Sequence, residues 1–263
     1  MECSPGPHGL VFTGCAYSRD LPGCLMNAES STFVLVHGAW SGGWCYARVA
    51  ALLRAHGHTV FTPTLTGQGE RAHLLSGAIN LSTHIADVLG VFRCERLSDV
   101  VLAGHSYGGM VITGVADRIA GQIGALAYLD AFVPQDGQSL FDINIPANTQ
   151  RFIDSAGASS GLSVPAPSSA YFGVNAADAC TVDTLATPFP LGCFTEKLKL
   201  SGAYRSVKKH LYVHGTVLPR ESPFRPFYER AVAAGWSAHA LACGHHVMLD
   251  EPEQTAALLE AMA

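Results

Sequence analysis

From Thr32 onward, short runs of β-branched and apolar residues alternate with longer segments of helical period. This alternation is typical of a mostly parallel sheet with helices on both faces, and it predicts the α/β fold class. Strands are expected at residues 32–36, 59–61, 100–103, 125–129, 210–213 and 237–241. Helices are expected around residues 45–53 and 85–92, and over residues 224–234 and 251–262.

The 263 residues are 48% hydrophobic, which is ample for one well-buried domain, expected over residues 31–263. Residues 1–30 have no basic start and no long apolar stretch, so they indicate a flexible N-terminal extension, not a signal peptide. Residues 134–200 are rich in Ser, Pro, Ala and Gly, and they interrupt the alternation. Because they carry several aromatic residues that need burial, they predict a small cap inserted over the sheet, in preference to a long surface loop. These aromatic residues are Phe141, Phe152, Tyr171, Phe172, Phe189 and Phe194.

Charge and composition exclude several functional classes. The net charge is -5 and no Lys or Arg cluster exceeds a short pair, so nucleic acid is not an expected partner. No apolar run approaches the ~18 residues that cross a bilayer, so no membrane insertion is expected. The cysteines are scattered, and free thiols in the cytoplasm are expected in preference to a Cys180–Cys193 bridge.

Two segments resemble cofactor or metal motifs only superficially. Residues 67–72 come close to a dinucleotide-binding fingerprint, but no helix of the required length follows them. His56 and His58 lie at a helix-to-strand turn without an acidic third ligand, which favours a structural role. We therefore expect no cofactor and no metal, in a protein that is a monomer or a homodimer.

Residues 101–110 read Val-Leu-Ala-Gly-His-Ser-Tyr-Gly-Gly-Met, which places a Gly-x-Ser-x-Gly pentapeptide between a strand-like run and a helix-compatible run. Such a strand-turn-helix holds its serine in strained backbone angles and exposes the hydroxyl at the sheet edge. Glycines at positions 104 and 108 let the helix pass close to the strand. Ser106 is therefore the candidate nucleophile, and the amide of Tyr107 can bind developing negative charge.

An activated serine needs a base and a second oxyanion donor. A histidine pair precedes the last predicted helix, and we choose His245 as the base, with its neighbour His246 as an ordinary loop residue. The first strand ends in a Gly-rich turn that allows the amide of Ala39 to point at the same place as that of Tyr107.

The acid that orients the base has two candidates. No carboxylate follows the strand at residues 210–213 until Glu221, whereas Asp130 stands at the end of a buried strand. A carboxylate buried there is costly unless it is paired, and a histidine partner would explain it. We favour Asp130 and keep Glu221 as the alternative.

Four segments, residues 33–40, 62–73, 104–109 and 128–134, resemble one branch of the α/β-hydrolase superfamily. This branch contains bacterial carboxylesterases of the EstC and pyrethroid-hydrolase type, and it is related to plant methyl-salicylate esterases and hydroxynitrile lyases. The resemblance implies Ser106 as nucleophile, His245 as base, and Ala39 with Tyr107 as oxyanion donors. Plant relatives carry the acid at the position of Val217, so the chain departs from them there and is more similar to the bacterial branch, which supports Asp130.

The sequence favours a serine carboxylesterase acting on a small hydrophobic ester, aryl or pyrethroid-like, with Trp40 and Phe132 in the substrate pocket. One alternative is a non-catalytic or weakly catalytic receptor for a small ligand. Another is a hydroxynitrile-lyase-like enzyme. The lyases resembled here have Thr and Lys where this chain has Gly38 and His246, so hydrolysis is preferred.

Overall fold

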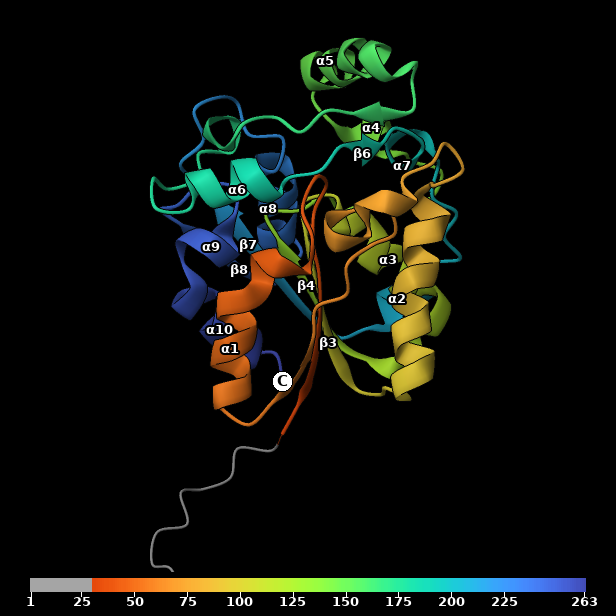
Figure 1. The fold of residues 1–263 in the computed structure, drawn as a ribbon. Coiled ribbons are helices and arrows are strands. Elements are labelled where there is room, and N and C mark those ends of the chain that lie inside the picture. The colour runs from red at the N-terminus through yellow and green to blue at the C-terminus, as the bar shows by residue number, and fades with distance from the viewer. Residues whose placement is uncertain (1–29) are drawn as a thin grey trace, which may run out of the picture.

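The computed structural model describes residues 30–263. The predicted N-terminal extension therefore lies outside the described residues, apart from Ser30. A six-stranded sheet with the order β2-β1-β3-β4-β7-β8 forms the centre, and every neighbouring pair is parallel (Figure 1). Its strands are β1 (Thr32–Val36), β2 (Thr59–Phe61), β3 (Val100–His105), β4 (Ile123–Leu129), β7 (Lys209–Gly215) and β8 (Ser237–Leu241). The predicted α/β class is confirmed.

The helices cover both faces of this sheet, as the helical periods predict. One face carries α2 (Leu81–Glu95), α3 (Gly108–Ile119) and α8 (Arg225–Ala233). The other carries α1 (Ala47–Ala55), α9 (Val247–Asp250) and α10 (Pro252–Glu260). Local sequence sets several helix starts, since Asn80 caps α2 through the amide of Thr83, and proline stands in the first turn of α8 and α10.

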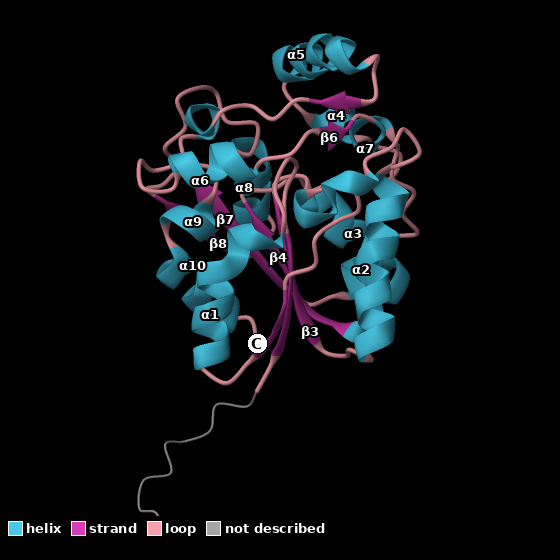
Figure 2. Ribbon diagram, in the orientation of Figure 1, coloured by secondary structure: helices cyan, strands magenta, loops and turns pink. Residues whose placement is uncertain are grey.

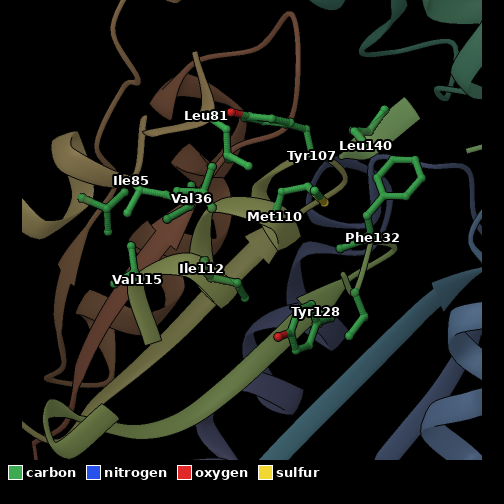
Figure 3. Packing of buried hydrophobic residues seen from close by; sticks show 14 of the residues in the cluster. Val36, Leu81, Ile85, Tyr107, Met110, Ile112, Val115, Tyr128, Phe132 and Leu140 are labelled. Atoms are coloured by element: carbon green, nitrogen blue, oxygen red, sulfur yellow. The ribbon is translucent and has the colours of Figure 1, made fainter. Parts of the chain in front are cut away.

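Side chains of alternate residues along each strand feed two separate hydrophobic clusters. In β1, Val34 and Val36 belong to the cluster on the α2 and α3 face, whereas Phe33 and Leu35 belong to the other. This follows from the twofold period of a strand that is buried on both sides. Figure 3 shows the first cluster, in which Tyr107 and Met110 at the start of α3 lie near Phe132 and Leu140.

The elements of the chain between β4 and β7 lie beyond the carboxyl ends of the strands, at the top of the view (Figure 2), and most of them are short. They are α4 (Leu140–Ile143), α5 (Pro146–Ala156), β5 (Ser163–Val164), α6 (Ala179–Leu185), β6 (Phe189–Pro190) and α7 (Gly192–Thr195). The strands β5 and β6 pair with each other and are separate from the main sheet. The aromatic residues at positions 152, 172, 189 and 194 are buried here, as their number suggested.

Two further features bear on the sequence predictions. Within residues 30–263, no helix is both long enough and apolar enough to cross a membrane. The cysteines of this part of the chain are all unpaired, including Cys180 and Cys193. The preference for free thiols over that bridge is therefore confirmed for the described cysteines.

Candidate active site

Ser106 lies in the tight turn between β3 and α3, in a left-handed backbone conformation with φ 53°. Its carbonyl oxygen accepts hydrogen bonds from the amides of Gly109 and Phe132, both at 3.1 Å, which hold the turn against the chain after β4. A Cβ on Gly104 would lie 2.6 Å from the carbonyl oxygen of Gly108. The glycines of the pentapeptide are thus required because the helix passes this close to the strand.

Asp130 follows β4 directly and is completely buried. Its Oδ2 accepts a hydrogen bond from His245 Nδ1 at 2.7 Å. Glu221, the alternative acid, is exposed and makes no side-chain contact with His245 in the part of the chain that the structure describes. The fold thus brings Asp130 to the histidine and leaves Glu221 in the neighbouring surface groove.

His245 lies in the loop between β8 and α9, where its ring is held from several sides. It stacks on Phe224 with ring centroids 4.5 Å apart and on Phe172 at 5.6 Å. The carbonyl oxygen of His245 accepts a hydrogen bond from His105 Nε2 at 2.9 Å. With Nδ1–H donated to Asp130, the imidazole tautomer leaves Nε2 free to take a proton.

Burial sets the charge state of this pair. Loss of hydration lowers the pKa of His245 well below its ordinary value, so the neutral imidazole, which is the form that a general base needs, is favoured. Burial also raises the pKa of Asp130, and the hydrogen bond from His214 opposes that rise. The carboxylate is therefore kept charged chiefly by the donors that surround it.

A cavity joins these groups. Ser106, His245, Ala39 and Tyr107 all line it, together with the predicted pocket residues Trp40 and Phe132. Among residues 30–263, no hydrogen bond joins the Ser106 hydroxyl to His245, as is common in serine hydrolases without substrate. The chain between β4 and β7 supplies part of the cavity lining, including Leu140, Phe152, Phe172 and Phe194.

The two predicted oxyanion donors share a further property. Within the described chain, neither the amide of Ala39 nor that of Tyr107 has a hydrogen-bond acceptor. The turn bearing Ala39 is held by His37, whose Nδ1 donates to the carbonyl oxygen of Gly38 at 2.7 Å. The Tyr107 hydroxyl is held at 3.0 Å by the Nδ1 of His84, which fixes its backbone at the start of α3. Two fixed, unpaired donors on residues that line one cavity suit a negatively charged oxygen.

Comparisons with known proteins identify the family of the chain. The model of the alpha/beta hydrolase family matches residues 33–258. The chain belongs to the alpha/beta hydrolase family. The hydrolase is 45% identical, over 88% of its own length and 99% of the relative's, to a carbendazim hydrolyzing esterase from Nocardioides sp. (strain SG-4G). The predicted superfamily is therefore confirmed.

Two solved structures show the same fold. An extracellular alpha/beta-hydrolase from a Paenibacillus species, described as sharing structural and functional homology with tobacco salicylic acid binding protein 2, superposes with a TM-score of 0.77. It is 28% identical, and the match covers 89% of this hydrolase and 99% of that chain. A pyrethroid hydrolase superposes with a TM-score of 0.65 at 19% identity, covering 88% and 96% of the two chains, and supports the fold alone.

One residue of the hydrolase that contacts Asp130 was not expected from the sequence. His214, at the end of β7, donates its Nδ1–H to Asp130 Oδ1 at 2.7 Å. The available signal was its position, because the end of β7 must reach the same sheet edge as the end of β4. The residue expected at the end of β7 was a carboxylate, whereas His214 there binds the carboxylate of Asp130.

His56 and His58, the histidines that the sequence analysis weighed as metal ligands, have different neighbours in the structure than expected. Over residues 30–263, no group of three or more histidine, cysteine or carboxylate side chains could hold a metal ion. His56 and His58 do have an acidic neighbour, since both contact Glu260 Oε1 of α10, at 2.5 and 3.3 Å. An acidic residue therefore does accompany the two histidines, contrary to the expectation, and its contacts tie the helix-to-strand turn to α10, which is a structural role.

Proposed function

We propose that the protein is a serine carboxylesterase that hydrolyses hydrophobic esters through an acyl-enzyme. At the level of enzyme class, a carboxylic ester hydrolase, the prediction is confirmed by the family and by the 45% identical carbendazim hydrolyzing esterase. The observation that supports the serine mechanism best is the 2.7 Å contact of Asp130 with His245 beside the cavity that Ser106 lines. A single strained turn would be weak evidence without that pair.

In this mechanism, Ser106 Oγ attacks the ester carbonyl while His245 Nε2 takes the hydroxyl proton. The amides of Ala39 and Tyr107 stabilise the oxyanion, each by about 3 kcal/mol. The tetrahedral intermediate collapses, His245 returns the proton to the departing alcohol, and the acyl group remains on the serine. Water, deprotonated by the same histidine, then releases the acid and restores the hydroxyl.

The substrate class follows from the cavity wall and from the relative. Aromatic side chains dominate the lining, and they suit a flat apolar group. We propose small aryl esters and carbamates as substrates. Carbendazim is the first compound to test, because the 45% identical relative is a carbendazim hydrolyzing esterase. Pyrethroid-like esters stay a prediction, as do a cytoplasmic location and the choice between monomer and homodimer.

The surroundings of Ser106 also bear on the two alternative functions, a lyase and a receptor. A Cβ on Gly38 would lie 2.8 Å from both Ser106 Cβ and His105 Nδ1. The threonine that the resembled lyases carry at this position therefore has no room, which favours hydrolysis over lyase chemistry. A receptor without activity needs no buried carboxylate at Asp130, whose burial costs stability.

The test is turnover of p-nitrophenyl butyrate by the wild type and by Ser106→Ala. We expect the change to lower kcat by a factor on the order of 10⁶, because the acyl-enzyme cannot form. Ser98→Ala, at an exposed serine, is the matched control and should retain wild-type activity. A fluorophosphonate should add one covalent adduct to the wild type and none to Ser106→Ala. Equal turnover by the wild type and Ser106→Ala would defeat the esterase proposal.

A further inference from the structure

Asp130 makes more contacts than a triad acid requires. Its Oδ2 faces His245 Nδ1, while its Oδ1 accepts from His214 Nδ1 at 2.7 Å and from the Gly215 amide at 3.3 Å. The two histidines come from different elements, since His214 ends β7 and His245 follows β8. One buried carboxylate thus binds two imidazoles, one through each oxygen.

We propose that His214 is a positioning residue for the reaction: it holds Oδ1 so that Oδ2 stays directed at His245 and the carboxylate stays charged. This inference rests on the proposed function, because it assumes that the Asp130–His245 pair serves Ser106. His214 is absent from the residues that line the Ser106 cavity and instead borders the separate groove beside α8. It therefore acts through Asp130 and not on substrate.

The geometry explains why a second donor matters. Rotation of a carboxylate about its last side-chain bond is only weakly restricted, so one contact does not fix both oxygens. The Oδ1 contacts come from β7, which pairs directly with β4 and is part of the rigid sheet. The ring of His214 is itself held by stacking on Tyr228 of α8, with centroids 5.4 Å apart. His245, by contrast, stands on a loop, so the sheet-bound contact is the one that defines the carboxylate's orientation.

The charges around Asp130 agree with this role. The other titratable groups that face it are His105 from β3, Tyr212 from β7, Arg220 from the chain after β7, and Cys243 and His246 from the chain after β8. Burial lowers the pKa of the two histidines and raises that of the tyrosine and the cysteine, so these four are neutral. Arg220 contributes positive charge from farther away, without a hydrogen bond to the carboxylate. The His214 contact is the largest influence that lowers the pKa of Asp130.

The sign of the expected change follows. Removing a donor from the negatively charged Asp130–His245 pair raises the pair's affinity for a proton, whichever of the two takes it. The inactive, protonated pair then forms at higher pH. The acidic limb of the pH profile of kcat should therefore move to higher pH.

The experiment compares His214→Phe, which removes the donor, with His214→Asn, whose side-chain amide can restore it. We expect His214→Phe to lower kcat about 10- to 100-fold with KM within about twofold, and to raise the acidic limb by about one to two pH units. His214→Asn should recover most of both effects. His210→Phe, four residues earlier on the same strand and away from Asp130, is the matched control and should leave the profile unchanged.

Several outcomes would overturn the proposal. The role of His214 would be structural if His214→Phe kept the acidic limb of the wild type or changed KM alone. The same conclusion would follow if His214→Asn were as impaired as His214→Phe. If His214→Phe does not yield folded protein, His214→Leu is compared in the same way. Titration of Asp130 in ¹³C-aspartate-labelled protein gives a readout that does not need turnover. The carboxyl signal of Asp130 reports the protonation of the Asp130–His245 pair, so an unchanged titration midpoint in the variant contradicts the role of His214. Equal turnover by the wild type and Ser106→Ala contradicts only the esterase.

Discussion

At the scale of single residues, backbone strain marks the ends of the central strands. Trp40, Ser106 and Asp130 are non-glycine residues in the left-handed region, with φ values of 63°, 53° and 43°. Each follows one of the neighbouring strands β1, β3 and β4 at the same sheet edge. Such strain costs about 1–3 kcal/mol per residue and persists where the surrounding structure enforces it. The proposed nucleophile and its distant acid are thus both held by strained turns.

The first residue-scale prediction separates the two candidate acids. Asp130→Asn should lower kcat by a factor on the order of 10⁴, because an amide can stabilise the imidazole tautomer that has no free Nε2 to accept the serine proton. Glu221→Gln should leave kcat within about twofold, since that side chain is exposed and away from His245. Both are measured with p-nitrophenyl butyrate, after thermal melting has shown that each variant is folded. A larger loss for Glu221→Gln than for Asp130→Asn would reverse the assignment.

At the scale of elements, the chain between β4 and β7 lines much of the cavity at Ser106. The cavity at Ser106 has a volume of about 30 Å³, which accommodates water but no aryl ester. Phe152 of α5 forms part of its wall, packing against Trp40 and Phe194 with ring centroids 5.2 and 5.7 Å away. We therefore propose that residues 134–200 act as a cap that must shift to admit substrate.

A smaller residue at position 152 should relieve this constraint. Phe152→Leu should raise kcat/KM for p-nitrophenyl benzoate relative to p-nitrophenyl acetate by about threefold to tenfold, because space is gained beside the acyl group. Ile153→Ala, next to it on α5 but with a side chain 46% exposed, should leave that ratio unchanged. The ratio is obtained from steady-state kinetics of both variants and the wild type. A uniform change with both esters would mean that Phe152 affects stability or cap motion but not acyl selection.

At the scale of the whole molecule, buried neutral histidines link stability to pH. Burial lowers the pKa of His37, His84 and His246 from 6.5 to about 4. Between pH 6.5 and 4 the unfolded chain binds a proton at each position and the folded protein does not, so the free energy of unfolding falls as the pH falls. Each group contributes about 1.4 kcal/mol per pH unit in that window. Asp130, with a raised pKa, works in the opposite direction but is a single group.

Together the three histidines should lower the free energy of unfolding by about 4 kcal/mol per pH unit below pH 6.5, against a total of about 5–15 kcal/mol for a typical domain. Urea unfolding at pH 7.5, 6.5 and 5.5 measures this slope. His246→Gln should reduce the proton uptake on unfolding by about one. A free energy of unfolding that is flat from pH 7 to 5 would contradict this linkage.

Much of the fold could be predicted because local patterns encode burial. All six parallel strands lie where the apolar runs placed them. The helices predicted over residues 224–234 and 251–262 correspond to α8 and α10, whose ends differ from the prediction by one or two residues. The turn at Ser106 could be predicted because its glycines are required by close contacts between neighbouring segments of the chain. The elements between β4 and β7 were not predicted individually. Most of them have only two to seven residues, too few to show a period, and the eleven-residue α5 lies within a stretch that was interpreted only as a cap.

The sequence by itself determined the kinds of elements, their order, and the local turn that presents Ser106. Only the tertiary structure decided which strands are neighbours, and the site depends on that. Because β4 pairs with β7, Asp130 meets His214, 84 positions away in the chain, while the loop after β8 brings His245 to its other oxygen. Periodicity states which face of a strand is buried but not what lies beside it, since pairing is fixed by packing between distant segments. The two imidazoles on one carboxylate are therefore a property of the assembled sheet.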